Sequence, residues 1–482
     1  MNFRLIAYLV SALVFFLGLS MCLPLIIGLI YNDNGAWPLF LSLAVTSGVG
    51  GCVLLWTRGH QNFYLSHRDG MMIVALGWII SGLLATLPYL FSGAIPGFTD
   101  AYFESMSGFT TTGASILTNI EILPPSILFW RAQTQWLGGM GIIVLSVAIL
   151  PFLGIGGMQL YKAETPSPVV DKLTPRISDT AKLLWKIYFF LTVFQILLLL
   201  IGGMSLYDSV YHSFTTMPTG GFSPKNASVG HYQSTYIDFV ILTFMFLAGI
   251  NFTMHYKLVR GNVRQFFVNP EFLAYLSIAG LFIFLVFLDV YSTIYPRILD
   301  AFRYASFQVV SILTTTGFVT ADYEKWPAFS QAILFVCMFL GGMAGSTGGG
   351  IKIMRIILML KHCYLEIFRI IHPHATTMVK LGNVPVSQTI MRSIWGFFLL
   401  YMGIFILGVI ALAGLGMDMI SALSAMATCL GNVGPGLGSI GPMDNFAGVH
   451  PAGKWIMIFA MLLGRLEIYT IIVLLMPAFW RK

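Results

Sequence analysis

The chain has 482 residues, of which 57% are hydrophobic and only 9% are charged. A soluble globular domain carries about 25% charged residues, so this composition excludes a soluble protein. Aromatic residues make up 14% of the chain, which excludes a disordered one. The five cysteines lie apart from one another and form neither a disulfide framework nor a metal motif. In a soluble protein, the net charge of +7 would suggest binding to nucleic acid. In a membrane protein, the distribution of the charges along the chain must be examined first.

Apolar runs long enough to cross a bilayer, roughly 20 residues each, recur through the chain. The ten expected spans lie near residues 5–30, 37–56, 71–92, 127–153, 183–204, 237–256, 272–290, 328–360, 390–415 and 453–476. The first run is too long for a signal peptide. Four semi-apolar stretches between spans are too short to cross, and they cover residues 100–116, 207–222, 298–319 and 417–436. We therefore predict an all-α polytopic membrane protein with about ten transmembrane helices.

The charged residues indicate the orientation of these spans. With the N-terminus inside, the inner segments hold 19 of the 26 basic residues and six acids, and the outer side holds six basic residues and twelve acids. The balance of +13 inside and −6 outside is a strong positive-inside pattern. Both termini are therefore expected in the cytoplasm, and the short stretches enter from the outer, acidic side. The net charge marks topology and does not predict nucleic-acid binding.

One unit recurs four times after residue 70: a span, a short pore helix, a glycine-containing turn and a second span. The turns align on Gly113, Gly220, Gly317 and Gly434, which lie 107, 97 and 117 residues apart. A second set of small residues, such as Gly138-Gly139, follows each turn glycine by 25 to 31 residues. We divide the chain accordingly into a two-helix region at 1–69 and four pore repeats at 70–160, 161–262, 263–375 and 376–482.

Four such turns around one axis predict an ion pathway. Irregular backbone at membrane depth is tolerated only where it is buried in protein or lines a water-filled cavity. Rings of backbone carbonyls can replace the hydration shell of a cation, glycine permits a positive φ, and threonine hydroxyls stabilise a turn. A single turn could merely end a re-entrant helix, but four in register favour a filter. The expected filter residues are Thr111, Thr112, Gly113, Thr219, Gly220, Gly221, Thr315, Thr316, Gly317, Asn432, Val433 and Gly434.

Together with these turns, the segments 138–145, 151–161, 344–350 and 463–468 carry a family resemblance. Over nearly its whole length the chain resembles the Trk/Ktr/HKT superfamily of K⁺ transporters, and within it the TrkH/TrkG branch, whose extra N-terminal helix pair it shares. The resemblance implies K⁺ as the transported ion and a homodimer in the bacterial inner membrane, with one pore per subunit. It also implies a cytoplasmic ring of TrkA-like proteins that bind nucleotides and control opening. The second repeat departs from the pattern, with Met217-Pro218 before its turn.

A glycine-rich segment at 341–350 lies in the middle of an expected span and contains six glycines in ten positions. Glycine costs about 1 kcal/mol relative to alanine in a helix interior. Close helix packing through small residues is one explanation. Six glycines are more than helix packing requires. They favour a flexible loop that crosses the pore beneath the filter, as the resemblance also implies. The expected gate residues of this loop are Gly345, Ser346, Thr347, Gly348 and Gly349.

Two basic residues complete the expected gate. Arg465 occupies the place that glycine holds in the other three repeats, and a cation in mid-helix costs roughly 2.5–3.5 kcal/mol. Pairing with Glu467 is poor because positions i and i+2 lie on different helix faces. We therefore expect Arg465 to project below the filter, repel cations and brace the loop. Lys352 follows the loop, either as an ordinary positive-inside flank or as part of a lever that carries partner movement. The segment 154–182 is a second candidate for partner contact.

Three functions are candidates for this chain. The favoured one is K⁺ uptake through a gated, channel-like pore, and the alternative is an H⁺- or Na⁺-coupled symporter, which also uses broken helices. Arg465 and Glu467 are the only ionisable residues expected deep in a span, which weighs against proton coupling. An enzyme with Ser346 as nucleophile would need a nearby general base, and none is expected there, so we predict no enzyme. The glycine-rich loop lacks the Lys-Ser/Thr of a phosphate-binding loop, so we expect no nucleotide on this chain.

Overall fold

The structure is a computed structural model that describes residues 1–59, 66–141, 177–374, 378–382 and 384–481. Two sequence predictions fall partly outside these ranges: the second half of the span expected at 127–153, and most of the partner-contact segment at 154–182. Helices make up most of the described chain. The only strands in that part are β1 (Lys380–Leu381) and β2 (Val384–Pro385), which pair antiparallel as a small hairpin.

The helices can be assigned to the predicted repeats, whose boundaries stay predictions. The N-terminal region holds α1 (Phe3–Ser20), α2 (Cys22–Tyr31) and α3 (Ala36–Thr57). The first repeat holds α4 (His67–Leu84), α5 (Leu87–Ser92), α6 (Phe98–Phe109), α7 (Pro125–Trp136) and the π-helical turn η1 (Leu137–Gly141). The second repeat holds α10 (Ile177–Ile201), α11 (Leu206–Thr216), the 3₁₀ turn η2 (Ser228–Tyr232), α12 (Thr235–Ala248) and α13 (Phe252–Val259).

The third repeat holds α14 (Val263–Val268), α15 (Pro270–Val290), α16 (Ile298–Leu313), the 3₁₀ turn η3 (Tyr323–Lys325), α17 (Ala328–Cys337) and α18 (Ile353–Ile371). The fourth repeat holds α19 (Gln388–Gly414), α20 (Met419–Gly431), α21 (Pro451–Arg465), α22 (Tyr469–Leu475) and α23 (Pro477–Trp480). Polar caps begin two of the re-entrant helices: Ser205 accepts from an amide in the first turn of α11, and Asp418 does so in α20. These bonds satisfy amides in the first turn of each helix that have no partner within the helix.

Six helical segments in the described chain are long and apolar enough to cross a membrane. They are Phe3–Tyr31, Ala36–Thr57, Arg68–Ser92, Ala181–Ile201, Pro270–Val290 and Gln388–Gly414. Two further pairs pass the same test but are bent, α12 with α13 by 102° and α21 with α22 by 119°. These segments make the chain a multi-pass membrane protein, as its composition predicts.

The second span of each repeat is broken, whereas the sequence led us to expect a break only at 341–350. The spans predicted at 237–256 and 453–476 bend at Gly249 and just after Arg465, and α7 passes into the π-helical η1. The reason is close backbone approach. A Cβ at Gly138 would overlap the carbonyl oxygen of Phe109, and one at Gly464 would overlap that of Leu430. Gly138 and Gly464 therefore mark the points where the spans of the first and fourth repeats meet a pore helix and lose their regular course.

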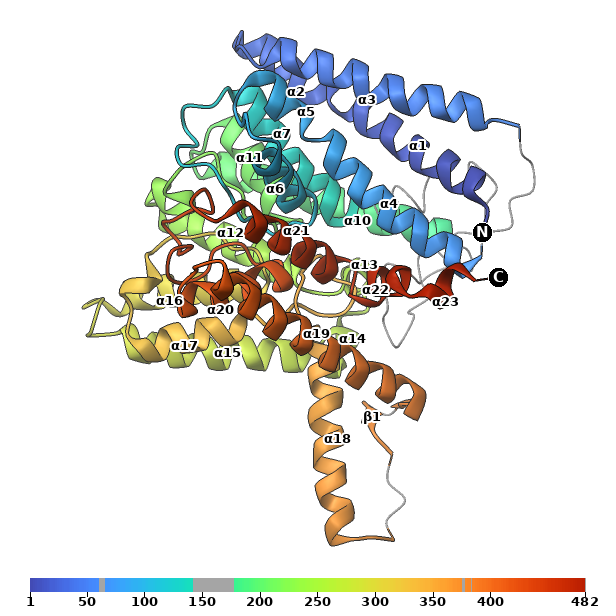
Figure 1. Cartoon of the computed structure of the whole chain (residues 1–482). Coiled ribbons are helices and arrows are strands. Elements are labelled where there is room, and N and C mark those ends of the chain that lie inside the picture. Colours follow the sequence, from blue (N-terminus) through green and yellow to red (C-terminus); the bar gives the residue numbers. More distant parts are fainter. Residues whose placement is uncertain (60–65, 142–176, 375–377, 383, 482) are drawn as a thin grey trace.

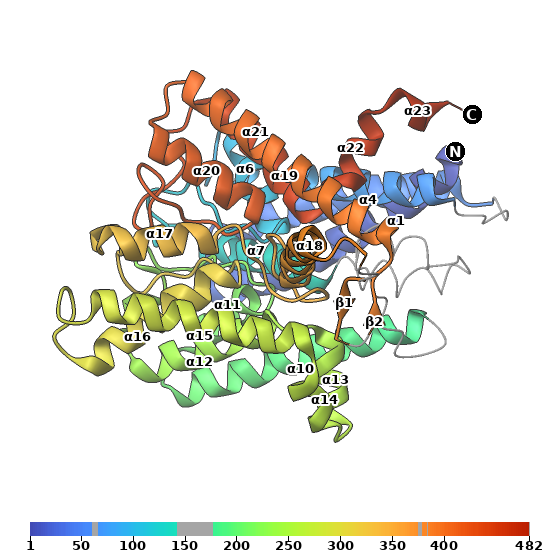
Figure 2. The same cartoon turned by 90° about the horizontal axis from the view of Figure 1, so that it is seen from below.

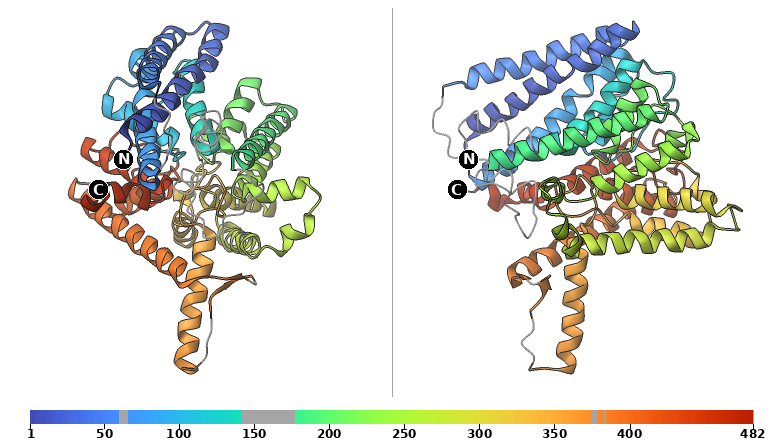
Figure 3. Two further views of the ribbon diagram at one scale, coloured as in Figure 1. Left: turned by 90° about the vertical axis from the view of Figure 1, so that its right-hand side faces the viewer. Right: turned by 180° about the vertical axis from the view of Figure 1, so that it is seen from behind.

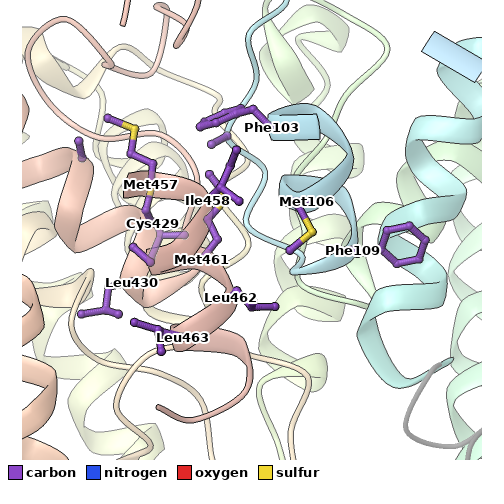
Figure 4. Packing of buried hydrophobic residues seen from close by; sticks show 14 of the residues in the cluster. Phe103, Met106, Phe109, Cys429, Leu430, Met457, Ile458, Met461, Leu462 and Leu463 are labelled. Carbon is purple, nitrogen blue, oxygen red and sulfur yellow. The ribbon is translucent and has the colours of Figure 1, made fainter. Parts of the chain in front are cut away.

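The repeats follow one another around a single axis. Viewed along the spans, the chain runs around the molecule in sequence order (Figure 3, left). The circle closes where the last repeat meets the first: Met457, Ile458 and Met461 of α21 pack toward Phe103 and Met106 of α6, within one buried hydrophobic cluster (Figure 4). The pore helices consequently converge on the centre of the molecule.

Two features lie outside this circle. The N- and C-termini lie at the same end of the bundle (Figure 1), where the Arg68 guanidinium donates to the carbonyl of Arg481 over 2.7 Å. Helix α18 projects sideways out of the bundle, across the direction of the spans (Figure 1). The β1–β2 hairpin lies beside the base of α18 (Figure 2), and Lys361 of α18 donates to the carbonyl of Lys380 over 2.9 Å.

Candidate ion-conduction pathway

All four turns adopt the same backbone conformation. Each has a non-glycine residue with positive φ and, two residues later, a glycine with positive φ. The non-glycine residues are Thr111, Thr219, Thr315 and Asn432, and the glycines are Gly113, Gly221, Gly317 and Gly434. The amide of each middle residue donates to the carbonyl five residues earlier over 2.8–2.9 Å, from Thr112 to Ser107, Gly220 to Thr215, Thr316 to Ser311 and Val433 to Thr428. The four turns are therefore copies of one motif.

This geometry corrects the alignment of the second repeat by one residue. The sequence aligned Gly220 with Gly113, Gly317 and Gly434, but the glycine with positive φ in that repeat is Gly221. The error arose because two adjacent glycines look alike in a sequence, whereas only one of them is in the left-handed region. Gly220 corresponds instead to the middle residues Thr112, Thr316 and Val433. The set of twelve filter residues is unchanged, since it already contains both glycines.

The turns contact one another in a closed ring. A Cβ added at each left-handed glycine would overlap the middle carbonyl oxygen of the next repeat: Gly113 against Gly220, Gly221 against Thr316, Gly317 against Val433, and Gly434 against Thr112. The order 1–2–3–4–1 returns to its start, so the four turns surround one axis. The middle carbonyls crowd this axis, and glycine is required at the neighbouring position both for its φ and for space.

Hydrogen bonds between threonine side chains stabilise the first and third turns. The Thr110 and Thr112 hydroxyls lie 2.7 Å apart, and the corresponding hydroxyls of Thr314 and Thr316 lie 2.8 Å apart. The fourth repeat lacks this pair, and there the Asn432 amide donates to the Thr112 hydroxyl over 3.0 Å and so ties the last turn to the first. These bonds stabilise the backbone of the turns and leave their carbonyls for other partners.

A buried ion pair supports the first two turns. Arg131 Nε lies 2.5 Å from Glu104 Oε1, and the two side chains are 2% and 0% exposed. The other carboxylate oxygen accepts from the amide of Ile116 over 2.9 Å, and Arg131 donates to the carbonyl of Ser223 over 3.0 Å. The charge count assigned both residues to the outer side, and no sequence pattern indicated that they pair. They connect the segments that follow the first and second turns.

Replacing Arg131 by methionine should destabilise the protein by about 3–5 kcal/mol, because it leaves the Glu104 carboxylate buried and unpaired. Thermal unfolding of the purified protein in detergent measures this as a lower melting temperature. Lys325→Met is the control, because Lys325 is 81% exposed in its pair with Asp322 and such surface pairs contribute about 0–1 kcal/mol. Equal melting temperatures for the two variants would contradict this role.

The glycine-rich loop between α17 and α18 lies against the third turn and the second repeat. The amide of Gly349 donates to the Thr315 hydroxyl over 2.7 Å, and the Thr347 hydroxyl donates to the carbonyl of Met217 over 3.0 Å. The amide of Phe252 donates to the carbonyl of Gly345, which has a φ of +78°. The Ser346 hydroxyl donates to Met343 within the loop.

Basic side chains hold the same loop. Arg465 donates to the Thr347 carbonyl and to the carbonyls of Gly138 and Gly139, each over 2.8 Å. It therefore connects the fourth repeat with the loop of the third and the broken span of the first. The Lys352 ammonium donates to the carbonyl of Gly348. Glu467 forms an interhelical ion pair with Arg355 of α18.

Sequence reasoning missed Glu271 as a loop contact. Its carboxylate, 4% exposed, accepts from the amide of Ala344 over 2.7 Å. Glutamate after proline is also typical of any first helical turn, so the sequence offered no distinct signal. Glu104, Arg131 and Arg355 are buried as well, so the protein interior holds ionisable groups that the sequence did not single out.

Comparison with known proteins agrees with this geometry. The model of the TrkH family, described as cation transport proteins, matches residues 40–482. The chain belongs to this family. A TrkH-family relative from Salmonella typhimurium, named Trk system potassium uptake protein TrkH, is 43% identical over the full length of both chains, and one of the same name from Halomonas elongata is 44% identical over the same share.

A solved TrkH structure also matches the fold. The crystal structure of the potassium transporter TrkH from Vibrio parahaemolyticus superimposes with a TM-score of 0.89, at 39% identity, over 100% of both chains. The predicted all-α polytopic fold with about ten transmembrane helices and the predicted family are thereby confirmed. The TrkH family consists of transporters, so the prediction that the chain is no enzyme is confirmed as well.

Proposed function

We propose that this protein takes up potassium ions across the bacterial inner membrane through a gated, K⁺-selective pore. The observation that carries the proposal is the closed ring in which Thr112, Gly220, Thr316 and Val433 present their carbonyls beside the left-handed glycines of the neighbouring turns. Carbonyl oxygens of this kind substitute for the hydration shell of K⁺. The names of the relatives, Trk system potassium uptake protein, support the same ion.

The proposed gate consists of the loop residues 345–349 with Lys352 and Arg465. Its support is the set of three bonds by which Arg465 spans from the fourth repeat to Thr347 and to the broken span of the first repeat. A guanidinium fixed beneath a carbonyl ring opposes the passage of cations. Arg355, paired with Glu467, connects α18 to the same region, so movement of α18 would reach the loop.

Fluxes of K⁺, Rb⁺ and Na⁺ into proteoliposomes test the transport proposal. We expect K⁺ and Rb⁺ uptake with little Na⁺ uptake, and a reversal potential that follows the K⁺ gradient alone when a pH or Na⁺ gradient is imposed. A reversal potential that shifts with either gradient would instead establish the alternative, an H⁺- or Na⁺-coupled symporter. The acids in this region do not favour that alternative, because Glu104 and Glu467 pair with arginines and Glu271 accepts from a backbone amide.

The proposal includes a cytoplasmic partner, a TrkA-like ring of nucleotide-binding proteins, and no nucleotide on this chain. Its support is the excess of basic residues on the predicted inner side, together with α18, whose projection from the bundle offers Lys361 and Arg369 for contact (Figure 1). Both termini, which lie at one end of the bundle, are placed in the cytoplasm. Nucleotide binding by the isolated chain would contradict this part of the proposal.

We propose that the protein forms a homodimer through the apolar face of α18. Leu360, Tyr364, Ile367 and Ile371 recur at helical spacing and are all exposed in the single chain. Ile367→Glu should convert a dimer to a monomer, because it places a charge in the middle of this face, and light scattering after size-exclusion chromatography measures the change. Arg369→Glu, on the opposite face of α18, is the control and should remain dimeric. A wild-type monomer, or a dimer that survives Ile367→Glu, would contradict this interface.

A further inference from the structure

One buried position differs in kind between the four repeats. Three residues before the small-residue break of each second span, the repeats carry Gln135, Met245, Met338 and Met461. All four side chains are fully buried. Methionine fills irregular apolar gaps, whereas a buried carboxamide is costly unless its hydrogen bonds are satisfied. Gln135 in the first repeat therefore needs hydrogen-bond partners.

Those partners lie in the second filter turn. Gln135 Nε2 donates to the carbonyl of Gly220 over 2.6 Å, and Gln135 Oε1 accepts from the amide of Phe222 over 3.1 Å. The carboxamide thus bridges the backbone on both sides of Gly221. Both of its polar atoms are satisfied by the backbone of the second turn. These two bonds fix the position of the Gln135 side chain and of the turn relative to one another.

The second turn is also the one without a side chain at the middle position. The other turns carry Thr112, Thr316 and Val433 there, whereas the second carries Gly220. Gly220 is not in the left-handed region, so its backbone would accept a side chain. Space prevents it, because the three atoms nearest to an added Cβ are those of the Gln135 carboxamide. Gln135 therefore occupies the volume that a filter side chain fills in the other repeats.

The second turn also lacks the hydroxyl pair found in the first and third. Pro218 stands where those repeats have Thr110 and Thr314, whose hydroxyls bond to the middle threonine. The peptide unit that carries the Gly220 carbonyl is tied to the pore helix by the Gly221 amide, which donates to the Thr215 carbonyl over 3.2 Å, but two adjacent glycines restrict the backbone least. The bridge from Gln135 replaces the missing restraint.

We propose that Gln135 is a selectivity-determining positioning residue that holds the Gly220 carbonyl in the filter ring. The inference rests on the proposed function, because it assigns a role within the K⁺ filter. Gln135 acts through the backbone of the second turn. It does so in place of the side chain that the other three turns carry themselves.

Gln135→Met tests the proposal, because methionine occupies the same buried position in the other three repeats and preserves the packing. We expect K⁺ flux to persist and the Na⁺/K⁺ permeability ratio, from reversal potentials in proteoliposomes, to rise about tenfold, the effect of one lost buried hydrogen bond on a competition between ions. Gln133→Met is the matched control, because Gln133 is buried in the same helix and donates to the carbonyl of Ser20 over 2.7 Å, away from the turns.

An unchanged ratio in Gln135→Met, or an equal rise in Gln133→Met, would overturn the inference. A wild-type protein that is not K⁺-selective would overturn the proposed function itself, and so the two failures are distinguishable. A merely structural role would lower the amount of folded protein and the flux of all ions together, without changing their ratio.

A compensating pair gives a second test. Gly220→Val alone places a side chain in the volume of the Gln135 carboxamide and should reduce K⁺ flux at least about tenfold. The double variant Gly220→Val with Gln135→Met reproduces the fourth turn, where Val433 and Met338 belong to one hydrophobic cluster, and should recover much of that flux. A double variant no more active than Gly220→Val would contradict the shared volume on which the inference depends.

Discussion

Arg465→Ala should raise K⁺ flux through the protein, measured without a cytoplasmic partner, by about tenfold or more. A fixed positive charge about 4 Å from a cation costs roughly 4 kcal/mol at the effective dielectric constant of a protein near its surface. The variant removes this charge together with three hydrogen bonds to Thr347, Gly138 and Gly139. Both losses favour an open pathway. Uptake of ⁸⁶Rb⁺ into proteoliposomes measures the change.

Two further variants separate repulsion from bracing. Arg465→Lys keeps the charge but cannot reach all three carbonyls with a planar fork of donors, whereas Arg465→Gln removes the charge and keeps a donor. If repulsion dominates, only the glutamine variant conducts like alanine. Arg303→Ala is the control, since Arg303 pairs with Asp238 of α12 over 2.7 Å, outside the glycine-rich loop. Unchanged conductance and unchanged gating in Arg465→Ala would refute the gate.

Gly113→Ser and Gly317→Ser should each abolish K⁺ selectivity, with a rise of at least about tenfold in the Na⁺/K⁺ permeability ratio or a loss of transport. Both glycines have positive φ, +82° and +79°, which costs other residues roughly 1–2 kcal/mol. A Cβ at either would also overlap a middle carbonyl of the next turn, Gly220 or Val433. The displaced carbonyls would no longer match the shell of K⁺. Reversal potentials under K⁺ and Na⁺ gradients measure the ratio.

Gly203→Ser is the matched control for backbone strain. Gly203 has a φ of +85°, and nothing lies within 4 Å of an added Cβ. It therefore carries the same conformational penalty without any contact to the filter. The control should keep wild-type selectivity even if it is less stable. Unaltered selectivity in both filter variants would refute the assignment of the turns.

Much of the architecture was predictable from local patterns. The apolar runs, the charge asymmetry and the recurring Gly/Thr turns are properties of short segments, and a fourfold repeat multiplies a weak signal. The glycine-rich loop after α17 was likewise visible, because six glycines contradict a helix. The breaks at Gly249 and after Arg465 were not visible, since one or two small residues are common in membrane helices.

The candidate site was predictable only in part. The twelve turn residues were identified, but the register of the second repeat was not, because Gly220 and Gly221 differ only in the φ that the folded ring imposes. The pairing of Arg131 with Glu104 was not predictable, since 27 residues separate two side chains that lie 2.5 Å apart. No local pattern reports such a pairing.

Taken alone, the amino-acid sequence determined a membrane protein with the number, order and predicted orientation of its repeats, because hydropathy, charge and glycine content act on each segment separately. The tertiary structure decided which glycine lies beside which carbonyl, where Arg465 donates its three bonds, and that Gln135 fills the space of an absent filter side chain. These contacts join residues of different repeats. They depend on the closure of the ring, which exists only once all four turns have packed around one axis.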